Sequence, residues 1–366
     1  TLTSTAAYGV MFCAKNGNRI TVDGTVEGSK LVGTLMITAG TDGHIEINGG
    51  TYENDKYCPI YVNGAVGSEN STVVVKNAVI RAIGTNSDQD MGVGVYLAGY
   101  GTSVFTDTTV EAPVTGIEIR AGKLTLNNCT VTGGNGELKA TPDGNGATVE
   151  NAALAVSQHT TRKAIEVTVN GGTFTATAAV YQTNVQGTGS ADVKASVKDG
   201  RFNGTVKAET AGTVAVSGGT FSAALDETVC ADGFIPKAND DGTYGVKEGA
   251  YVAEVNGNKY ESLAEALAAA GDGDTVTLVA DATADVVLDK NITFDLGGHT
   301  LANTNAGSAT LTVSAGAVVT VKNGTILGGS SYYAIRNNGT ATFMDIAATA
   351  GNVGSSMLDN RGTLTI

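Results

Sequence analysis

The residues of this chain that are best placed to do chemistry together lie between Arg81 and Arg120. Asp88 and Asp90 fall in one polar loop, and the two arginines flank that loop in the sequence. Clustered carboxylates bind Ca²⁺, and a basic side chain beside them can remove a proton from a substrate. Acidic residues in loops rich in glycine and asparagine are, however, usually turn formers exposed to water. Spacing alone does not show that these groups meet.

Other catalytic patterns are missing from the sequence. The three histidines, His44, His159 and His299, lie in separate stretches without the short spacing of metal ligands. The stretch 272–274, Asp-Gly-Asp, lacks the further ligands of a calcium loop, and neither a nucleophile elbow nor a phosphate-binding loop occurs. We therefore expect no catalytic residue, no metal and no cofactor.

A group of tyrosines is the strongest candidate for ligand binding. Tyrosine offers rigid, amphipathic contact area to proteins and sugars, and only 5% of the residues are aromatic. The alternative is that these rings only pack on the surface. The predicted ligand-binding residues are Tyr52, Tyr57, Tyr61, Tyr96 and Tyr100, with Tyr332 and Tyr333 as a weaker second group.

Charge and hydropathy exclude two classes of partner. The formal net charge is −14, and no cluster of basic residues offsets it, so nucleic acid is not expected to bind. No apolar run approaches the roughly 18 residues of a membrane span, so we expect no membrane contact within this segment. The four cysteines, which are Cys13, Cys58, Cys129 and Cys230, are widely spaced, and we interpret them as buried free thiols.

The chain is built from a repeated motif. Its clearest copy runs from Val167 to Thr175, in which every second residue of a short strand is apolar and an Asn-Gly-Gly turn leads to a Thr and a large apolar residue. Glycine and asparagine suit such corners because they tolerate positive φ. Similar stretches begin at Ile45, Leu124, Val214 and Val319.

The spacing of these copies predicts stacked parallel strands. Successive copies of the Thr position are separated by 26, 28, 30, 21, 43, 28 and 19 residues, and the step of 43 is interpreted as two turns of the chain. The marker residues are Thr25, Thr51, Val79, Thr109, Thr130, Thr173, Arg201 and Thr220. A period of about 24 residues with three short strands per repeat is typical of a parallel β-solenoid, whereas a propeller blade needs about 40 or more.

Three segments follow from this pattern. Residues 1–226 form a first solenoid of about nine coils, from which 84–92 and 133–146 are expected to protrude as loops. Residues 227–258 form a connector with a small hairpin. A helix over 260–270, with an apolar stripe and Gly271 as its stop, is expected to cap the strand edges and the core of a second solenoid within 259–366. The predicted fold class is all-β, in two segments of right-handed, single-stranded parallel β-helix, the second opened by a short capping α-helix.

The stretch from Tyr260 through Asp274 to Leu301 resembles the pectate-lyase-like right-handed β-helix modules of surface proteins from Gram-positive gut bacteria. The resemblance implies an extracellular segment of a longer, cell-surface attached chain, itself monomeric and non-catalytic. It would bind a host protein, such as a mucin or an immunoglobulin, or a glycan. The alternatives are a polysaccharide lyase or hydrolase of that class and a pure spacer.

Overall fold

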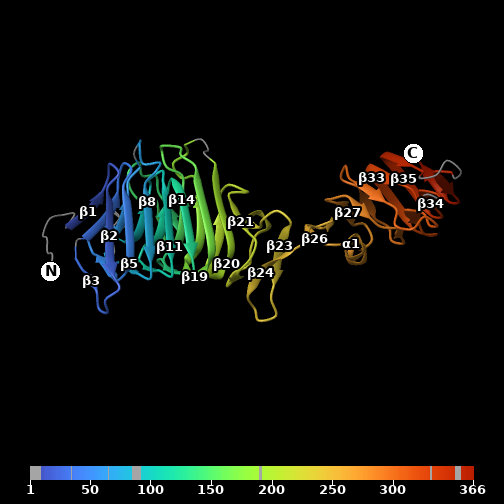
Figure 1. The fold of residues 1–366 in the computed structure, drawn as a ribbon. Helices are drawn as coiled ribbons and strands as arrows, with labels where there is room; N and C mark the ends of the chain where they lie inside the picture. The colour runs from blue at the N-terminus through green and yellow to red at the C-terminus, as the bar shows by residue number, and fades with distance from the viewer. Residues whose placement is uncertain are drawn as a thin grey trace. The chain divides into compact units, whose positions relative to one another are not determined.

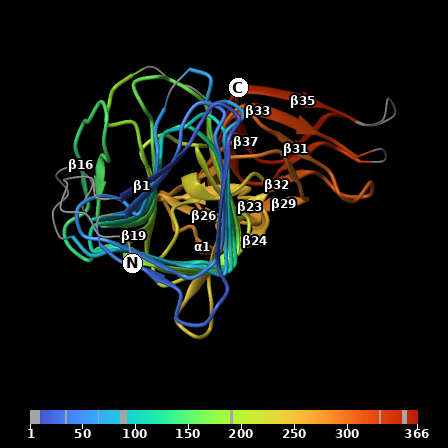
Figure 2. The same cartoon turned by 60° about the vertical axis from the view of Figure 1, so that its left-hand side comes forward.

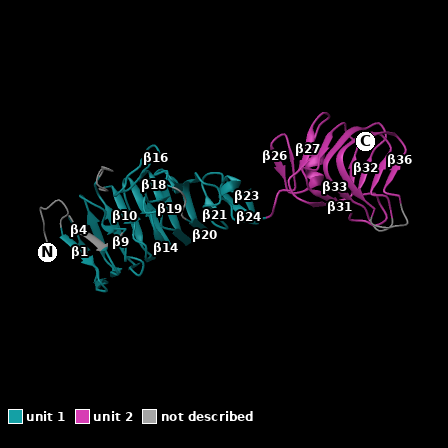
Figure 3. Cartoon of the chain, turned by 90° about the horizontal axis from the view of Figure 1, so that it is seen from above, with its two compact units in different colours: residues 1–248 teal, residues 249–366 magenta. Residues whose placement is uncertain are grey.

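The computed structural model describes residues 10–33, 35–64, 66–84, 92–188, 192–329, 332–350 and 356–366, without the side chains of residues 35–38. The chain divides into two compact units, unit 1 (residues 1–248) and unit 2 (residues 249–366), which Figure 3 colours separately. Both are nearly all β, and most of their strands pair in parallel.

The strands of unit 1 form three ladders, in which each strand pairs with the strand one circuit later in the chain (Figure 1). The first ladder contains β1 (Val10–Ala14), β4 (Leu35–Ala39), β7 (Ile60–Val62), β10 (Val93–Leu97), β13 (Thr115–Ile119), β18 (Ala152–Ser157) and the ends of β19 (Ile165–Thr183) and β20 (Val193–Ala208). The second contains β2 (Arg19–Gly24), β5 (His44–Gly49), β8 (Thr72–Lys76), β11 (Thr102–Thr106), β14 (Gly122–Asn127), the starts of β19 and β20, and β21 (Val214–Val216). The third contains β3 (Lys30–Leu31), β6 (Thr51–Asn54), β9 (Val79–Ala82), β12 (Thr109–Glu111), β15 (Cys129–Thr132), the middles of β19 and β20, and β22 (Thr220–Phe221).

Alternation of side chains builds the core between these ladders. In β14, Leu124 and Leu126 are buried, whereas Lys123 is exposed. Successive rungs place like residues above one another, since Phe174, Phe202 and Phe221 stack with ring centroids 5.0 and 4.8 Å apart. In the view of Figure 2 the strands of unit 1 overlie one another in a few files, as expected if each circuit repeats the path of the preceding one.

The corners between the second and third ladders need left-handed backbone. Asn77, Asp107 and Asn128 have φ of 54°, 47° and 52°, a region that their short polar side chains tolerate. Glycine takes the role elsewhere. Gly172 (φ 109°) pairs with Cys129 of the preceding rung, so close that an added Cβ would lie 2.0 Å from the Cys129 carbonyl oxygen.

The register corrects two expectations about the repeat. Thr130 pairs directly with Thr173, so the step of 43 residues is one circuit and not two. Lys30, not Thr25, is the partner of Thr51, because residues 25–29 form an extra loop at that corner. In the described residues each ladder of unit 1 therefore has eight rungs, one fewer than the period predicts.

The long circuit contains a segment that we call the covering segment, residues 133–150. We expect residues 133–146 to protrude as a loop, but the segment folds back, and Leu138 and Ala140 pack against Ala155 and Tyr181 on the outer face of the first ladder. Within the covering segment β16 (Lys139–Ala140) pairs antiparallel with β17 (Val149–Glu150), and Figure 2 shows β16 outside the files of strands. It is held there by hydrogen bonds such as that from Thr177 Oγ1 to the Gly136 carbonyl, at 2.6 Å. The other long insertion, residues 84–92, lies largely outside the described residues.

The end of unit 1 is an antiparallel hairpin. A short 3₁₀ helix, η2 (Glu227–Val229), is followed by β23 (Phe234–Ala238) and β24 (Tyr244–Glu248), which pair with each other. β24 also pairs antiparallel with β22, through Tyr244 and Phe221, and so covers the last edge of the third ladder. The boundary between the units follows this hairpin, inside the range 227–258 for which we expect a connector.

Unit 2 repeats the arrangement with shorter strands. Its first ladder contains β27 (Thr275–Leu278), β30 (Thr293–Asp295), the starts of β33 (Val318–Leu327) and β35 (Thr340–Thr349), and β37 (Thr363–Thr365). Its second contains β28 (Ala282–Thr283), β31 (Thr300–Ala302) and the ends of β33 and β35. Its third contains β29 (Val286–Leu288), β32 (Leu311–Val313), β34 (Ile335–Asn337) and β36 (Leu358–Asn360).

The start of unit 2 is covered by a hairpin and a helix. β25 (Ala253–Val255) pairs antiparallel with β26 (Asn258–Tyr260) and with the edge of β27. Helix α1 (Leu263–Ala269) is capped at its N-terminus by Ser262, whose Oγ accepts a hydrogen bond from Glu265 N, and it contributes Leu263 and Ala266 to the core. Thus the helix covers the core, whereas the hairpin covers the strand edge.

The structure bears on the expectations about membrane-spanning segments and about the cysteines. Among the described helices none has the length and apolar character needed to cross a membrane. Cys58 and Cys129 are buried free thiols as expected, but Cys13 is exposed and Cys230 is partly exposed.

Candidate functional site

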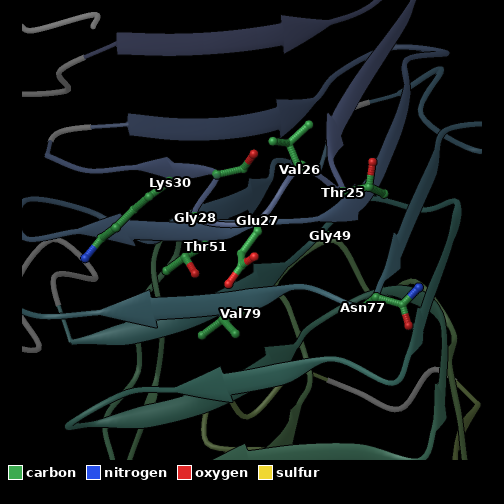
Figure 4. Close-up of a pocket in the computed structure, with 12 residues that line it drawn as sticks. Thr25, Val26, Glu27, Gly28, Lys30, Gly49, Thr51, Asn77 and Val79 are labelled. Atoms are coloured by element: carbon green, nitrogen blue, oxygen red, sulfur yellow. The ribbon is translucent and has the colours of Figure 1, made fainter.

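A recess at the first corner between the second and third ladders of unit 1 offers room for a ligand (Figure 4). It has a volume of about 480 Å³, within the range of small-molecule sites. Residues 24–30 form one side, 49–51 the floor, and Asn77 and Val79 of the next rung the other side. A second recess of about 250 Å³ adjoins it and shares Gly24, Ser29, Lys30, Gly50 and Thr51.

The loop of residues 25–29 creates the recess. The other rungs of unit 1 pass this corner with at most three residues between strands, but here five residues separate β2 from β3. Asp23 Oδ1 accepts hydrogen bonds from Thr25 N (3.1 Å) and Thr25 Oγ1 (2.7 Å), which fix the start of the loop and lower the pKa of Asp23. A turn from Ser29 N to the Val26 carbonyl, at 3.0 Å, closes it.

The floor is bare main chain. A Cβ on Gly24 would lie 2.7 Å from the carbonyl oxygen of Gly49, so adjacent rungs touch here through their backbones. Gly49 and Gly50 have φ of 75° and 84°, a conformation that glycine adopts readily. Gly24, Gly49 and Gly50 therefore leave main chain, and no side chain, facing this part of the recess.

The walls carry polar groups of several kinds. Hydroxyls come from Thr25, Ser29 and Thr51, and Asn77 supplies an amide. In Figure 4 Glu27 lies between Thr51 and Val79, while Lys30 and Asn77 lie on opposite sides. The Lys30 ammonium is 2.9 Å from Glu53 Oε2, and this hydrogen bond is the main cause that lowers the pKa of Glu53.

This arrangement suits reversible binding. Hydroxyl, amide and main-chain groups around an open recess can exchange hydrogen bonds with the hydroxyls of a sugar, and the methyl groups of Val26 and Val79 can contact its apolar face. Glu27 is exposed and supplies a carboxylate to the same space.

Three of the predicted ligand-binding tyrosines lie together. The Tyr61 and Tyr96 rings stack at 4.8 Å with an interplanar angle of 16°, and Tyr57 lies 5.2 Å from Tyr61. Tyr61 and Tyr96 are only 7% and 1% exposed, because the covering segment lies over them. The Tyr61 hydroxyl donates to the Asn145 carbonyl at 3.2 Å. Of the three, only the half-buried Tyr57 leaves much of its ring accessible.

The other two tyrosines lie apart from this group. Tyr52 points into the core, donates a hydrogen bond to the Gly49 carbonyl at 3.0 Å, and has its pKa raised to about 12 by burial. Tyr100 is half-buried in the turn after β10, with the Lys163 ammonium 4.7 Å from its ring centroid. Ligand binding by the five tyrosines stays a prediction, and Tyr57 and Tyr100 are the two with accessible surface.

A buried ion pair lies next to the stacked tyrosines. Glu118 and Arg120, both 0% exposed, approach within 3.9 Å. Glu118 accepts hydrogen bonds from Thr148 N at 2.9 Å, Thr148 Oγ1 at 2.6 Å and Val149 N at 3.2 Å. Burial raises the pKa of Glu118 to about 7, although Arg120 and the Thr148 donors act to lower it. The carboxylate therefore ties the covering segment to the first ladder.

Arg120 completes this tie. Its NH1 donates to the Tyr96 hydroxyl at 3.4 Å and to the Gly146 carbonyl, and its NH2 reaches the Gln158 carbonyl at 3.5 Å. Its Nε has no hydrogen-bond acceptor within the described parts of the chain. His159, which is 8% exposed, lies nearby, and its pKa is lowered first by burial and then by the charge of Arg120.

The hypothesis of a base acting beside bound Ca²⁺ needs an available arginine, but Arg81 and Arg120 are both paired with carboxylates. Arg81 is bound between Glu53 (3.2 Å) and Glu111 (2.5 Å), and these hydrogen bonds raise its pKa, so it holds its proton more strongly. Arg120 is buried. Asp88 and Asp90 lie outside the described residues, and in the parts that are described no three His, Cys, Asp or Glu side chains are placed to hold a metal.

The sequence pattern does not reveal the recess, because Thr25 fits the repeated Thr position. A signal was available, since Gly24 and Gly28 are separated by three residues, whereas other corners have adjacent or nearly adjacent turn formers. The sequence also gives no sign that Glu118 and Arg120 are buried, because alternation in Gly-Ile-Glu-Ile-Arg puts both charges on the outward face of the strand.

Searches with protein-family models, among curated proteins and among solved structures found no match for this chain.

Proposed function

We propose that each unit is a right-handed, single-stranded parallel β-helix. The support is the order of the strands, since the chain visits the three ladders of unit 1 in the same sequence in every circuit and those of unit 2 likewise. Right-handedness is the expected hand, because nearly all crossovers between parallel strands are right-handed.

We further propose that the chain is a non-catalytic, extracellular segment of a bacterial surface protein that presents a binding surface, and that its ligand is a glycan. The observation that carries this proposal is the 480 Å³ recess at the first corner, with its hydroxyl, amide and main-chain lining. A stack of short circuits provides a stiff support on which an extra loop forms such a recess without disturbing the core.

The enzymatic alternative is less well supported. A lyase needs a basic group that can accept a proton, but Arg81 is held between two carboxylates and Arg120 is buried under the covering segment. The recess itself contains one carboxylate, Glu27, and its only cationic side chain, Lys30, is paired with Glu53.

Thr51 provides a sharp test of glycan binding in the recess. Thr51→Val keeps the shape of the side chain and removes the hydroxyl, so one neutral hydrogen bond is lost and the affinity for a glycan selected on an array should fall about 3- to 10-fold. Isothermal titration calorimetry would measure this change.

The matched control is Thr109→Val. Thr51, Val79 and Thr109 occupy the same register position on three successive rungs, but Thr109 does not line the recess. Equal losses in the two variants, or an array on which no glycan binds, would contradict the proposed function. An empty array with a bound host protein would favour the protein-binding alternative.

A further inference from the structure

We propose that unit 2 carries a second binding site, specific for a sugar that bears a carboxylate, formed by Tyr332, Tyr333, Arg336, Asp359 and Arg361. These residues, which we call the arginine–tyrosine patch, lie on and beside β34 and β36. The patch is independent of the recess in unit 1 and of the function proposed for that recess.

Arg336 organises the aromatic part of the patch. Its guanidinium carbon lies 4.9 Å from the ring centroid of Tyr332 and 5.5 Å from that of Tyr333, which are cation–π contacts with both rings. The two rings meet edge to face, at 5.1 Å and 70°. Both tyrosines are half-buried, so each keeps part of its surface for a ligand while its orientation is fixed.

Asp359 fixes the two arginines next to each other. Arg336 and Asp359 are register partners on adjacent rungs. Asp359 Oδ2 accepts hydrogen bonds from Arg336 Nε at 3.0 Å and Arg361 Nε at 3.1 Å, and it lies 2.9 Å from Arg336 NH2. One carboxylate thus neutralises one of two guanidinium groups, and the patch keeps a charge of +1 in a chain whose net charge is −14.

Arg361 is the group left to bind an anion. Its side chain is 61% exposed, and among the described residues its terminal nitrogens have no acceptor, since only Nε is engaged. Two terminal N–H groups in one plane match the two oxygens of a carboxylate. The hydroxyls of Tyr332 and Tyr333 also lack a partner in the described parts of the chain, so they can bond to sugar hydroxyls beside that carboxylate.

The size of the patch favours a sugar over a protein. A stable protein interface needs about 800 Å² on each partner with an apolar centre. Here only five residues form the patch, and the register partner of Arg336 on the preceding rung is the polar, half-buried Thr312. One or two sugar residues, with a carboxylate on Arg361 and a ring against the tyrosines, match this extent.

Titration calorimetry on the complete chain tests the proposal with 3′-sialyllactose and with a glucuronic-acid-terminated disaccharide, which represent the two common sources of a sugar carboxylate. Lactose and the methyl ester of the bound acid are the neutral counterparts. We expect at least one acid to bind, its ester to bind about tenfold or more weakly, and Arg361→Gln to weaken binding of the acid to the same degree.

Arg19→Gln is the matched control, because Arg19 is also an exposed arginine paired with an acid, Glu46, on an outward strand face, but among the described residues no tyrosine ring contacts it. It should leave the affinity within about twofold, because Arg19 belongs to unit 1 and is not part of the patch, and salt weakens the effect of an exposed charge that does not touch the ligand. Thr51→Val should also leave acid binding unchanged, which separates this site from the recess. Binding of neither acid, equal binding of acid and ester, or equal losses in Arg361→Gln and Arg19→Gln would overturn the proposal.

Discussion

Glu118→Ala is expected to lower the free energy of unfolding of unit 1 by about 3–5 kcal/mol, because it leaves a fully buried guanidinium without its counter-charge. The same change removes the acceptor of Thr148 and Val149, which hold the covering segment. We therefore also expect faster proteolytic cleavage within residues 133–150. Chemical denaturation and limited proteolysis measure the two effects.

Glu166→Ala is the matched control for that variant. Glu166 also pairs with a basic residue, Lys123 at 2.8 Å, but both side chains are more than half exposed, at 57% and 63%. The loss of such a surface pair costs less than about 1 kcal/mol. Replacing both Glu118 and Arg120 by apolar residues should recover part of the stability. A Glu118→Ala variant as stable as Glu166→Ala would show that the pair is not buried as described.

The pH dependence of stability gives a second measure of the same carboxylate. Its pKa is raised from 4.5 in the unfolded chain to about 7 in the folded protein. The folded state therefore binds the proton more tightly, and the stability that protonation of Glu118 adds is fully present below pH 4.5 and is lost as the pH rises to about 7. The difference in stability between the wild type and Glu118→Gln should fall by on the order of 3 kcal/mol across this window. A difference that stays constant would contradict the raised pKa.

Gly172→Ala should be the most damaging of the glycine substitutions at the corners. A residue other than glycine at φ 109° is strained by about 1–3 kcal/mol. The new Cβ would also lie 2.0 Å from the Cys129 carbonyl oxygen, and relieving that overlap requires two adjacent rungs to separate, at a further cost of at least about 2 kcal/mol. Thermal and chemical denaturation would measure the total.

Gly171→Ala separates strain from overlap. Gly171 has nearly the same conformation, with φ of 117°, but a Cβ there would meet no atom within 4 Å. It should therefore show the strain alone and be clearly more stable than Gly172→Ala. If the two variants unfold at the same denaturant concentration, the rungs are not in contact at this corner.

The parts of the fold that could be predicted from sequence are those set by local rules. A strand and a turn follow from the alternation of Val167 to Val169 and from the Asn-Gly-Gly corner after it. Parallel pairing could be inferred from the spacing of the repeats, because the copies at Thr130, Thr173 and Thr220 occupy the same register position. Helix α1 was also predictable, because its cap Ser262 and its apolar stripe are local signals.

The parts that could not be predicted depend on what an insertion packs against. The residues before and after 133–150 keep the register whether the insertion protrudes or folds back, so a long circuit and two short ones look alike in sequence. Burial of Glu118 and Tyr96 follows only from the folded-back arrangement. The recess could not be predicted for the same reason. The five residues inserted after Gly24 shift the Thr position but leave the alternation of the strands on either side intact.

Cysteine cross-linking across the long circuit tests the stacked, in-register arrangement most directly. Thr125 and Thr168 are half-exposed register partners although 43 residues separate them, and Thr168 is in turn the partner of Ser196. Adjacent strands lie about 4.8 Å apart, within the range that a disulfide can bridge, and strands two rungs apart lie about twice as far. In a background with Cys13→Ser and Cys230→Ser, Thr125→Cys with Thr168→Cys should oxidise readily to an intramolecular disulfide, and Thr125→Cys with Ser196→Cys should not. A disulfide in the second pair, or none in the first, would contradict the arrangement of one rung per circuit.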